Sequence, residues 1–402
     1  MIKLGDAAAR QTAIVFCCVV AFLDGADTQA LAIAAPSISQ EFAIGPAALG
    51  LIFSANLLGA TIGAAACGAL ADRFGARRVL IGCTLAFGIF QFLTSMAFDY
   101  SSLTLLRFFA GLGLGGAAPA FLDLAAANAR PERRSAQAAI VWAFFPLGGL
   151  AGGFINGWLV QDHGWPTMFM AGGVVPIAVA FTIMLLVAEP PRAAKAVDTA
   201  PRPSVLRTLA SDPKLRRHSL LLACIYFSAF GTLAAVTVWM PSMMAARGFS
   251  AMVGGQILSW HALGALLSMA SAGILMQRLS LYVLFAGLLL SSIGLVILGA
   301  FMGSFALVAG MMVLLGIFLG LAASGGIALA QHLFPVEIRA GGGGLAMACG
   351  RAGQMLLPAV IGWLLSLQLT SGTVLAVIAS APLLGSLAAV ALARTYRLTP
   401  RP

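Results

Sequence analysis

Residues 305–332 read FALVAGMMVLLGIFLGLAASGGIALAQH, a run that contains no Asp, Glu, Lys or Arg. A helix rises 1.5 Å per residue, so about twenty apolar residues cross the hydrocarbon core of a bilayer. The run therefore predicts a membrane-spanning helix. Over all 402 residues, 60% are hydrophobic and 9% are charged, whereas an ordinary globular domain has about 25% charged residues. We expect lipid, rather than water, to surround most of the chain.

Similar runs recur along the sequence and predict an all-α membrane protein with twelve transmembrane helices. We expect the spans near residues 13–35, 47–70, 79–98, 102–127, 136–159, 166–188, 219–243, 252–276, 281–302, 305–332, 341–366 and 372–393. The one long polar segment, residues 189–217, separates an N-terminal six-helix bundle (1–188) from a C-terminal one (218–402). Two parallel halves of six spans, with a site between them, are a known transporter plan.

A pseudo-repeat supports this division, because the fourth and tenth spans both run through glycines into related loops. These loops read Pro131-Glu132-Arg133-Arg134 and Pro335-Val336-Glu337-Ile338-Arg339.

The basic residues predict the orientation. If both termini are cytoplasmic, all 23 Lys and Arg residues except Arg107, Arg247 and Arg351 fall in cytoplasmic segments. We therefore expect a protein of the cytoplasmic (inner) membrane. The net charge of +10 is spread over loops between apolar runs, so it indicates contact with anionic lipid headgroups and not with nucleic acid.

The six cysteines lie within apolar runs and show no Cys-x-x-Cys or Cys/His metal spacing. We expect them to be small packing residues, with no metal and no cofactor bound to the chain. No nucleophile–base pair or soluble signalling domain is evident either, which argues against an enzyme or a receptor.

The loop after the second span reads Gly68-Ala-Leu-Ala-Asp72-Arg73-Phe-Gly75-Ala-Arg77-Arg78. This stretch resembles the signature of the major facilitator superfamily, in which the loop is a gating latch between helices. Position 76 is Ala, where that family usually has a basic residue, and the second-half counterpart, Gly273 to Arg278, lacks the acid. The resemblance implies an asymmetric latch; an ordinary cytoplasmic basic loop is the alternative.

Two acids lie inside the first predicted span, in Asp24-Gly-Ala-Asp27. One ionised acid at the middle of a membrane costs about 2.5–3.5 kcal/mol on insertion scales, so such residues usually serve a transport pathway. Residues three apart share a helix face, and two close carboxyls tend to share a proton. We therefore expect Asp24 and Asp27 to couple transport to protons. The alternative is a structural ion pair with Arg107 or Arg351.

This Asp-Gly-x-Asp motif resembles the aromatic acid:proton symporter branch of the superfamily, which carries compounds such as 4-hydroxybenzoate and 3-(3-hydroxyphenyl)propionate. Further matches lie at Arg107–Pro119, Gly172–Pro176, Glu337–Arg339 and Gly350–Gly353. The fourth span departs from the branch, with Ala120 and Ala127 where an Asn and a Glu are common. Asp123 either replaces that Glu or pairs with Arg130 or Arg133.

Two arginines lie within predicted spans. Arg351 is deep, and its planar guanidinium suits bidentate recognition of a carboxylate, so we expect it to anchor the substrate. Arg107 lies near the outer end of the fourth span. It either extends to water or serves as a fixed cation for a substrate carboxylate or the first-span acids.

Aromatic and imidazole side chains inside the spans are candidate contacts for a phenolic ring. Trp142, Tyr226 and His261 are the residues we select, with Trp260 also available, although packing is the ordinary role of such residues. Trp158, Trp165 and Trp239 are expected to lie in the outer aromatic belt.

These observations predict a transporter that imports a small aromatic carboxylate with protons, by alternating access, and that functions as a monomer. A drug or metabolite exporter on the same scaffold is the alternative.

Overall fold

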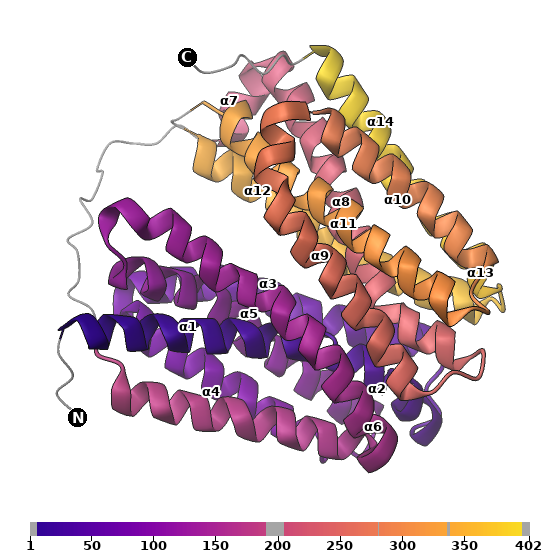
Figure 1. Cartoon of the computed structure of the whole chain (residues 1–402). Coiled ribbons are helices and arrows are strands. Elements are labelled where there is room, and N and C mark those ends of the chain that lie inside the picture. The colour runs from indigo at the N-terminus through magenta and orange to yellow at the C-terminus, as the bar shows by residue number, and fades with distance from the viewer. Residues whose placement is uncertain (1–5, 190–204, 280, 336–337, 396–402) are drawn as a thin grey trace. The chain divides into compact units, whose positions relative to one another are not determined.

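The computed structural model describes residues 6–189, 205–279, 281–335 and 338–395, and every regular element within these ranges is a helix (Figure 1). A few helical side chains inside these ranges, including that of Asp72, lie outside the description. The predicted linker falls largely on residues 190–204, which are also outside the described residues.

The first part of the chain forms helices close to the predicted spans. They are α1 (Asp6–Thr28), α2 (Ala30–Glu41), α3 (Pro46–Phe74), α4 (Ala76–Thr94), α5 (Tyr100–Asn128), the short 3-10 helix η1 (Pro131–Arg133) and α6 (Arg134–Leu186). Local chemistry sets several of these ends. Pro46 opens α3, where its missing N–H costs no hydrogen bond, and Asp99 caps α5 by accepting from the Ser102 N–H at 2.7 Å.

The second part contains α7 (Val205–Ser211), α8 (Pro213–Ala245), α9 (Ala251–Leu279), α10 (Tyr282–Ala300), α11 (Phe305–Leu333), α12 (Arg339–Ser366), α13 (Ser371–Ile378) and α14 (Ser380–Thr395). The short helix α7 was not predicted, because the segment that contains it was interpreted as a linker.

Local breaks explain how these helices correspond to spans. Helices α1 and α2 follow each other across Gln29 and form one apolar stretch, as α13 and α14 do across Ala379. Helix α6 joins two predicted spans and turns at Gly164, whose φ of 81° and ψ of 162° are readily available only to glycine.

Ten stretches of the described residues are helical, long and apolar enough to cross a membrane. One of them, Ala136–Leu186, contains the Gly164 bend and therefore holds two spans. Helix α9 coincides with the eighth predicted span. The twelve-span, all-helical fold expected from the sequence is confirmed.

The contacts divide the chain into two compact units. The first unit contains Met1–Ala194 and Val238–Ala262, and the second contains Lys195–Thr237 and Leu263–Pro402. The end of α8 and the start of α9 therefore pack with the helices of the first unit. The division at residues 189–217 remains a prediction from the sequence.

Glycines allow very close helix packing in the first unit. A Cβ atom at Gly63 would lie 2.0 Å from the Leu112 carbonyl oxygen on α5, and one at Gly148 would lie 1.9 Å from the Phe22 oxygen on α1. Such approach of small residues is how membrane helices associate. All six cysteines are free thiols, and Cys17, Cys67 and Cys83 belong to the same buried apolar cluster as Phe121.

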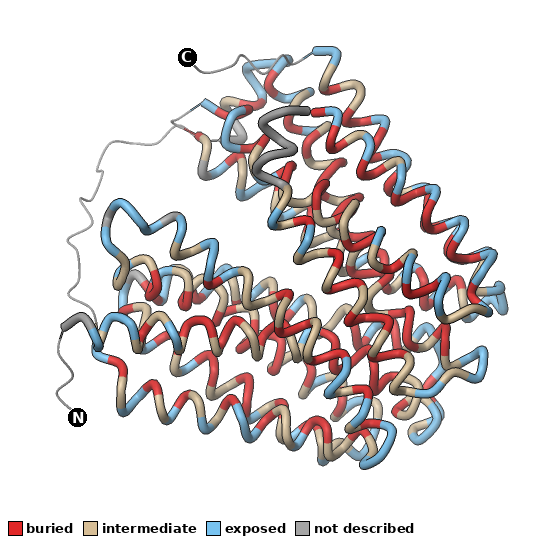
Figure 2. The backbone as a smooth tube through the Cα atoms, in the orientation of Figure 1, coloured by how far each residue is buried: buried red, intermediate tan, exposed pale blue. Residues whose placement is uncertain are grey.

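The second unit has its own core. Buried side chains of α8, α10, α11 and α14, such as Leu222, Leu284, Leu329 and Leu392, meet there. In both units many large apolar side chains are exposed instead; Leu185 of the first unit is 63% exposed and Leu220 of the second is 66% exposed. Figure 2 shows such exposed positions along the outer sides of the helices. This distribution fits helices whose outer faces contact lipid.

Candidate functional site

The two first-span acids lie at the end of α1. Asp24 is buried and Asp27 is partly buried, and the Thr28 hydroxyl donates to the main-chain oxygen of Asp24 at 2.8 Å. Gly25 brings this turn onto α6, since a Cβ there would lie 1.8 Å from the Phe145 carbonyl oxygen. The Asn156 amide also donates to the Ala26 oxygen at 2.9 Å. The backbone that carries both acids is thus fixed against α6.

Asp27 has a partner that the sequence did not suggest. The Gln91 side-chain amide, on α4, donates to a carboxylate oxygen of Asp27. Gln91 is 1% exposed, and Gly172 of α6 lies against its amide nitrogen, where a Cβ would be only 3.1 Å away. The hydrogen-bond partner of this acid is therefore a neutral, buried amide.

Arg107 is 1% exposed, so the expected extension to water is wrong. Its Nη2 donates to the Thr94 hydroxyl at 2.6 Å, and its guanidinium carbon lies 4.7 Å from the centre of the Phe169 ring. Both partners are neutral. A charge-assisted hydrogen bond and a cation–π contact hold this buried cation inside the bundle.

Asp27 and Arg107 interact electrostatically. Among the residues that the structure describes, however, the carboxylate bonds to Gln91 and the guanidinium bonds to Thr94, and the two do not form a direct ion pair. We call Asp27, Gln91, Thr94, Arg107 and Phe169 the acid–arginine cluster. It brings together side chains from α1, α4, α5 and α6.

Only the charged members of this cluster, Asp27 and Arg107, were predicted from the sequence. Gln91 could have been selected from the sequence, because it is the one side-chain amide in residues 79–94 of α4 and an isolated polar group in a membrane helix needs a hydrogen-bond partner. Nothing in the sequence distinguishes Thr94 or Phe169, because their roles depend on the position of Arg107 in the fold.

A buried aromatic group adjoins the cluster. Trp165 packs edge-on against Phe169, with ring centres 6.0 Å apart, and its indole N–H donates to Glu41 at 2.5 Å. Trp165 is 3% exposed and Trp239, which packs edge-on against Phe53, is 2% exposed. The belt prediction is therefore wrong for these two tryptophans, because each finds its partners inside the protein. Trp158 is 48% exposed, so a belt position stays a prediction for it.

The predicted ring contacts of the first unit are Trp142 and His261. Trp142 is partly exposed on α6 and stacks on Phe145 with ring centres 5.5 Å apart. His261, on α9, is 4% exposed, and its Nε2 has no hydrogen-bond partner among the described residues. The neighbouring Leu258 accepts a 3.4 Å hydrogen bond from Gln29.

The second unit carries the other two predicted substrate residues. Tyr226 of α8 is 3% exposed and packs against Phe230, while Gly326 and Gly350 face its ring at Cβ distances of 3.1 and 3.4 Å. Arg351, next to Gly350, is partly buried, and its Nη1 donates to Gln354 at 3.2 Å. Tyr226 and Arg351 thus lie in one neighbourhood of that unit.

The predicted latch lies where α3 passes into α4. Gly75 ends α3 with a φ of 96°, and a Cβ there would lie 2.2 Å from a Glu189 carboxylate oxygen. Arg77 donates to the Met184 carbonyl oxygen at 2.7 Å. The latch thus contacts the end of α6.

The remaining latch residues are Gly68, Asp72, Arg73 and Arg78. Gly68 has open space around it, and Arg73 and Arg78 are exposed. The Asp72 side chain lies outside the described residues. Asp123 of α5 is also exposed.

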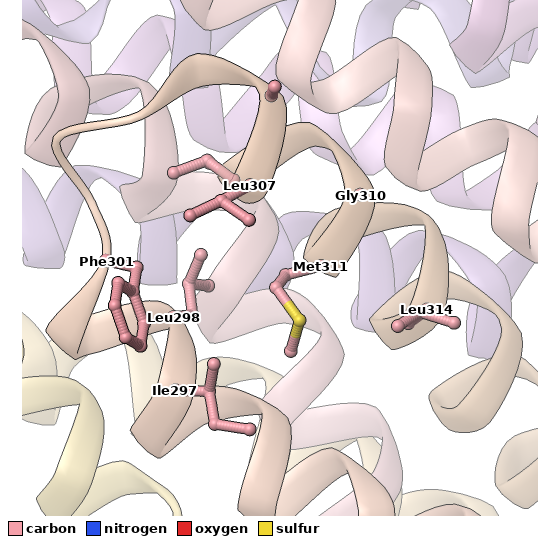
Figure 3. A pocket seen from close by; sticks show the side chains of 9 residues that line it. Ile297, Leu298, Phe301, Leu307, Gly310, Met311 and Leu314 are labelled. Carbon is pink, nitrogen blue, oxygen red and sulfur yellow. The ribbon is translucent and has the colours of Figure 1, made fainter.

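One cavity in the second unit is too apolar to bind a substrate carboxylate. It has a volume of about 250 Å³ between α10 and α11, and apolar residues including Phe301, Leu307 and Met311 line it (Figure 3). Among the described residues, no group of three or more His, Cys, Asp or Glu side chains is placed to hold a metal ion.

Comparison with known proteins identifies the family. The model described as Major Facilitator Superfamily matches residues 17–281 and 222–402. The chain is 34% identical over 374 residues to a 3-(3-hydroxy-phenyl)propionate transporter from Escherichia coli (strain K12), with 91% of this chain and 89% of that protein covered. It is 28% identical over 379 residues to the 4-hydroxybenzoate transporter PcaK from Pseudomonas putida, with 85% and 83% covered.

A solved structure supports the fold. A bacterial homolog of the human lysosomal transporter Spinster, in an inward-facing and occupied conformation, superimposes with a TM-score of 0.78. The alignment covers 98% of this chain and 99% of that one at 16% identity, so the likeness concerns the fold alone. With the family model matching nearly the whole chain and a curated relative above 30% identity, this protein is a membrane transporter that belongs to the Major Facilitator Superfamily.

Proposed function

We propose that this chain imports small aromatic carboxylates together with protons, by alternating access. The curated relatives named above are transporters of hydroxylated aromatic acids, and a gallate transporter from Pseudomonas putida is 27% identical over 385 residues. The observation that carries the proposal is the acid–arginine cluster. It holds a carboxylate and a guanidinium within electrostatic reach of each other, and each is hydrogen-bonded to a neutral group.

Asp27 is the proposed proton carrier. An acid bound directly to an arginine is locked in its ionised form, whereas one solvated by an amide is able to gain and lose a proton. Arg107 then balances the ionised form. Asp24, one turn earlier and also buried, is the second proposed proton-coupling residue.

The proposed substrate-binding residues are Arg351, Arg107, Trp142, Tyr226 and His261. Arg351 anchors the carboxylate, with Arg107 as a second cation, because guanidinium groups bind carboxylates in a bidentate geometry. Trp142, Tyr226 and His261 contact the ring. His261 suits a phenolic hydroxyl, because its Nε2 is buried without a partner among the described residues.

Alternating access is proposed to arise from rocking of the halves 1–188 and 218–402, joined by the linker 189–217. The latch of Gly68, Asp72, Arg73, Gly75, Arg77 and Arg78 gates the cytoplasmic side. Proton and substrate binding shift the inward–outward equilibrium because the loaded and empty carriers differ in conformational free energy. We propose that the protein works as a monomer in the cytoplasmic membrane, with both termini cytoplasmic.

Uptake into proteoliposomes tests this function. The purified chain is reconstituted, and labelled 4-hydroxybenzoate or 3-(3-hydroxyphenyl)propionate is added at acidic outside pH. We expect accumulation that a protonophore abolishes and that Arg351→Ala reduces severely. Uptake undiminished by the protonophore would exclude proton coupling, and the absence of binding by any aromatic acid in a screen would exclude the substrate class.

A further inference from the structure

Gln91 is the least expected member of the acid–arginine cluster. It is 1% exposed, and its amide nitrogen donates to Asp27 while its Oε1 is buried with no hydrogen-bond partner among the described residues. A buried acceptor without a partner is a destabilising feature. Its presence beside a proposed proton carrier calls for a functional explanation.

The chemistry of the amide supplies one. An ionised carboxylate only accepts hydrogen bonds, so it needs the NH₂ group of Gln91; a protonated carboxyl has an O–H that needs an acceptor. The Gln91 oxygen is such an acceptor on the same planar group. The terminal torsion of glutamine is broad and roughly two-fold, so rotation exchanges the oxygen and the nitrogen at one position.

Gly172 is the neighbour of the Gln91 amide that bears on this rotation. Gly172 of α6 faces the amide, and even a single methyl there would lie 3.1 Å from the nitrogen. Glycine at position 172 leaves room that any other residue would reduce.

Few other charges face Asp27. Arg107 on α5 is the charged group that interacts with it from another helix, and Asp24 lies on its own helix. Residues 142–156 of α6, which pack along α1, contain no acidic, basic or histidine residue. Glu41, at the end of α2, accepts a hydrogen bond from the indole N–H of Trp165.

We propose that Gln91 is a positioning residue for proton coupling that offers its NH₂ to ionised Asp27 and, after rotation, its oxygen to protonated Asp27. Both protonation states of the buried acid are then hydrogen-bonded. This inference rests on the proposed function, because it acts through the proton carried by Asp27.

Two variants test it in full-length protein in proteoliposomes. Gln91→Met keeps the approximate shape but removes both the donor and the acceptor, and the charge-assisted hydrogen bond lost from ionised Asp27 is the stronger of the two. Gln91→Glu is nearly isosteric and forces two carboxyls to share a proton. In both, the pH at which proton-driven uptake falls by half is expected to rise, by about one unit for Gln91→Met, because the two lost hydrogen bonds differ in strength by about that amount. Thr84→Val, a polar-to-apolar change at a buried position of the same helix, is the control and leaves that pH unchanged.

Infrared difference spectroscopy provides a second readout. The carbonyl band of the protonated carboxyl, assigned by its loss in Asp27→Asn, is expected at higher frequency in Gln91→Met because its hydrogen bond is missing. If the wild type shows this band and proton-driven uptake, but neither Gln91 variant moves the band or the pH midpoint, the role of Gln91 is refuted and the proposed function stands. Uptake that stays proton-driven in Asp27→Asn refutes Asp27 as the proton carrier, and wild-type uptake that a protonophore leaves undiminished refutes the proposed function itself.

Discussion

Gly25→Ala is the most local perturbation of the proposed proton site. A Cβ at this position lies 1.8 Å from the Phe145 carbonyl oxygen, 2.8 Å from its carbon and 3.0 Å from the Gly149 nitrogen. All three are main-chain atoms, so no side-chain rotation relieves the clash. To reach the 3.0 Å below which real Cβ contacts are essentially absent, α1 and α6 must separate by about 1.2 Å.

That separation displaces Asp27 from Gln91, because Asp27 lies only two residues from Gly25 and Gln91 is held on α4. Overpacking of this kind costs about 1–3 kcal/mol of stability, which leaves the protein folded. A misplacement of about 1 Å in a reacting geometry reduces rates by about 100-fold. We therefore expect a folded protein whose proton-driven uptake falls on the order of 100-fold.

The assay compares Gly25→Ala with Gly82→Ala by thermal unfolding in detergent and by uptake into proteoliposomes. Gly82 lies on α4 with no atom within 4 Å of an added Cβ, so alanine is expected to be neutral or to stabilise the helix by up to about 1 kcal/mol. Wild-type uptake by a folded Gly25→Ala protein would show that the contact between α1 and α6 does not position the acid.

Three further outcomes are expected. Thr94→Val removes the hydrogen bond to buried Arg107 and should lower the free energy of unfolding by about 1.5–3 kcal/mol. The Thr104 hydroxyl donates only within its own helix, to the Tyr100 carbonyl oxygen, so Thr104→Val should lower the free energy of unfolding by less in the same experiment. Arg351→Lys should raise the KM for uptake about tenfold, because one charge-assisted hydrogen bond to the carboxylate is lost; an unchanged KM would exclude Arg351 as the anchor. The Ser102 hydroxyl and N–H lower the pKa of Asp99, so the stabilisation from this cap is present above about pH 4 and is lost as the pH falls through the folded-state pKa. The difference in melting temperature between wild type and Asp99→Ala should therefore disappear in acid. A difference that stays constant with pH would refute this role.

The spans were predictable from the sequence because each is a long apolar run bounded by charge, glycine or proline. Helix α7 and the positions of the breaks were not, since a short helix and a local turn leave the apolar pattern unchanged. The α6 turn, for example, depends on a single dihedral pair at Gly164.

The charged part of the site was also predictable, because an acid or an arginine in an apolar helix is costly enough to indicate a role. Its neutral part was not. Gln91, Thr94 and Phe169 acquire their functions from Asp27 and Arg107, which are distant in sequence. The belt rule failed at Trp165 and Trp239 for the same reason, since it places tryptophans by depth and does not include partners such as Glu41 and Phe53.

The most direct test of the central claim measures substrate accumulation and substrate exchange in the same proteoliposomes, for wild type and Asp27→Asn. Exchange of labelled for unlabelled aromatic acid needs no net proton movement, whereas accumulation against a gradient does. We expect that wild-type protein does both and that Asp27→Asn exchanges substrate but does not accumulate it under an inward proton gradient. Accumulation by Asp27→Asn at the wild-type level would show that Asp27 does not carry the coupled proton.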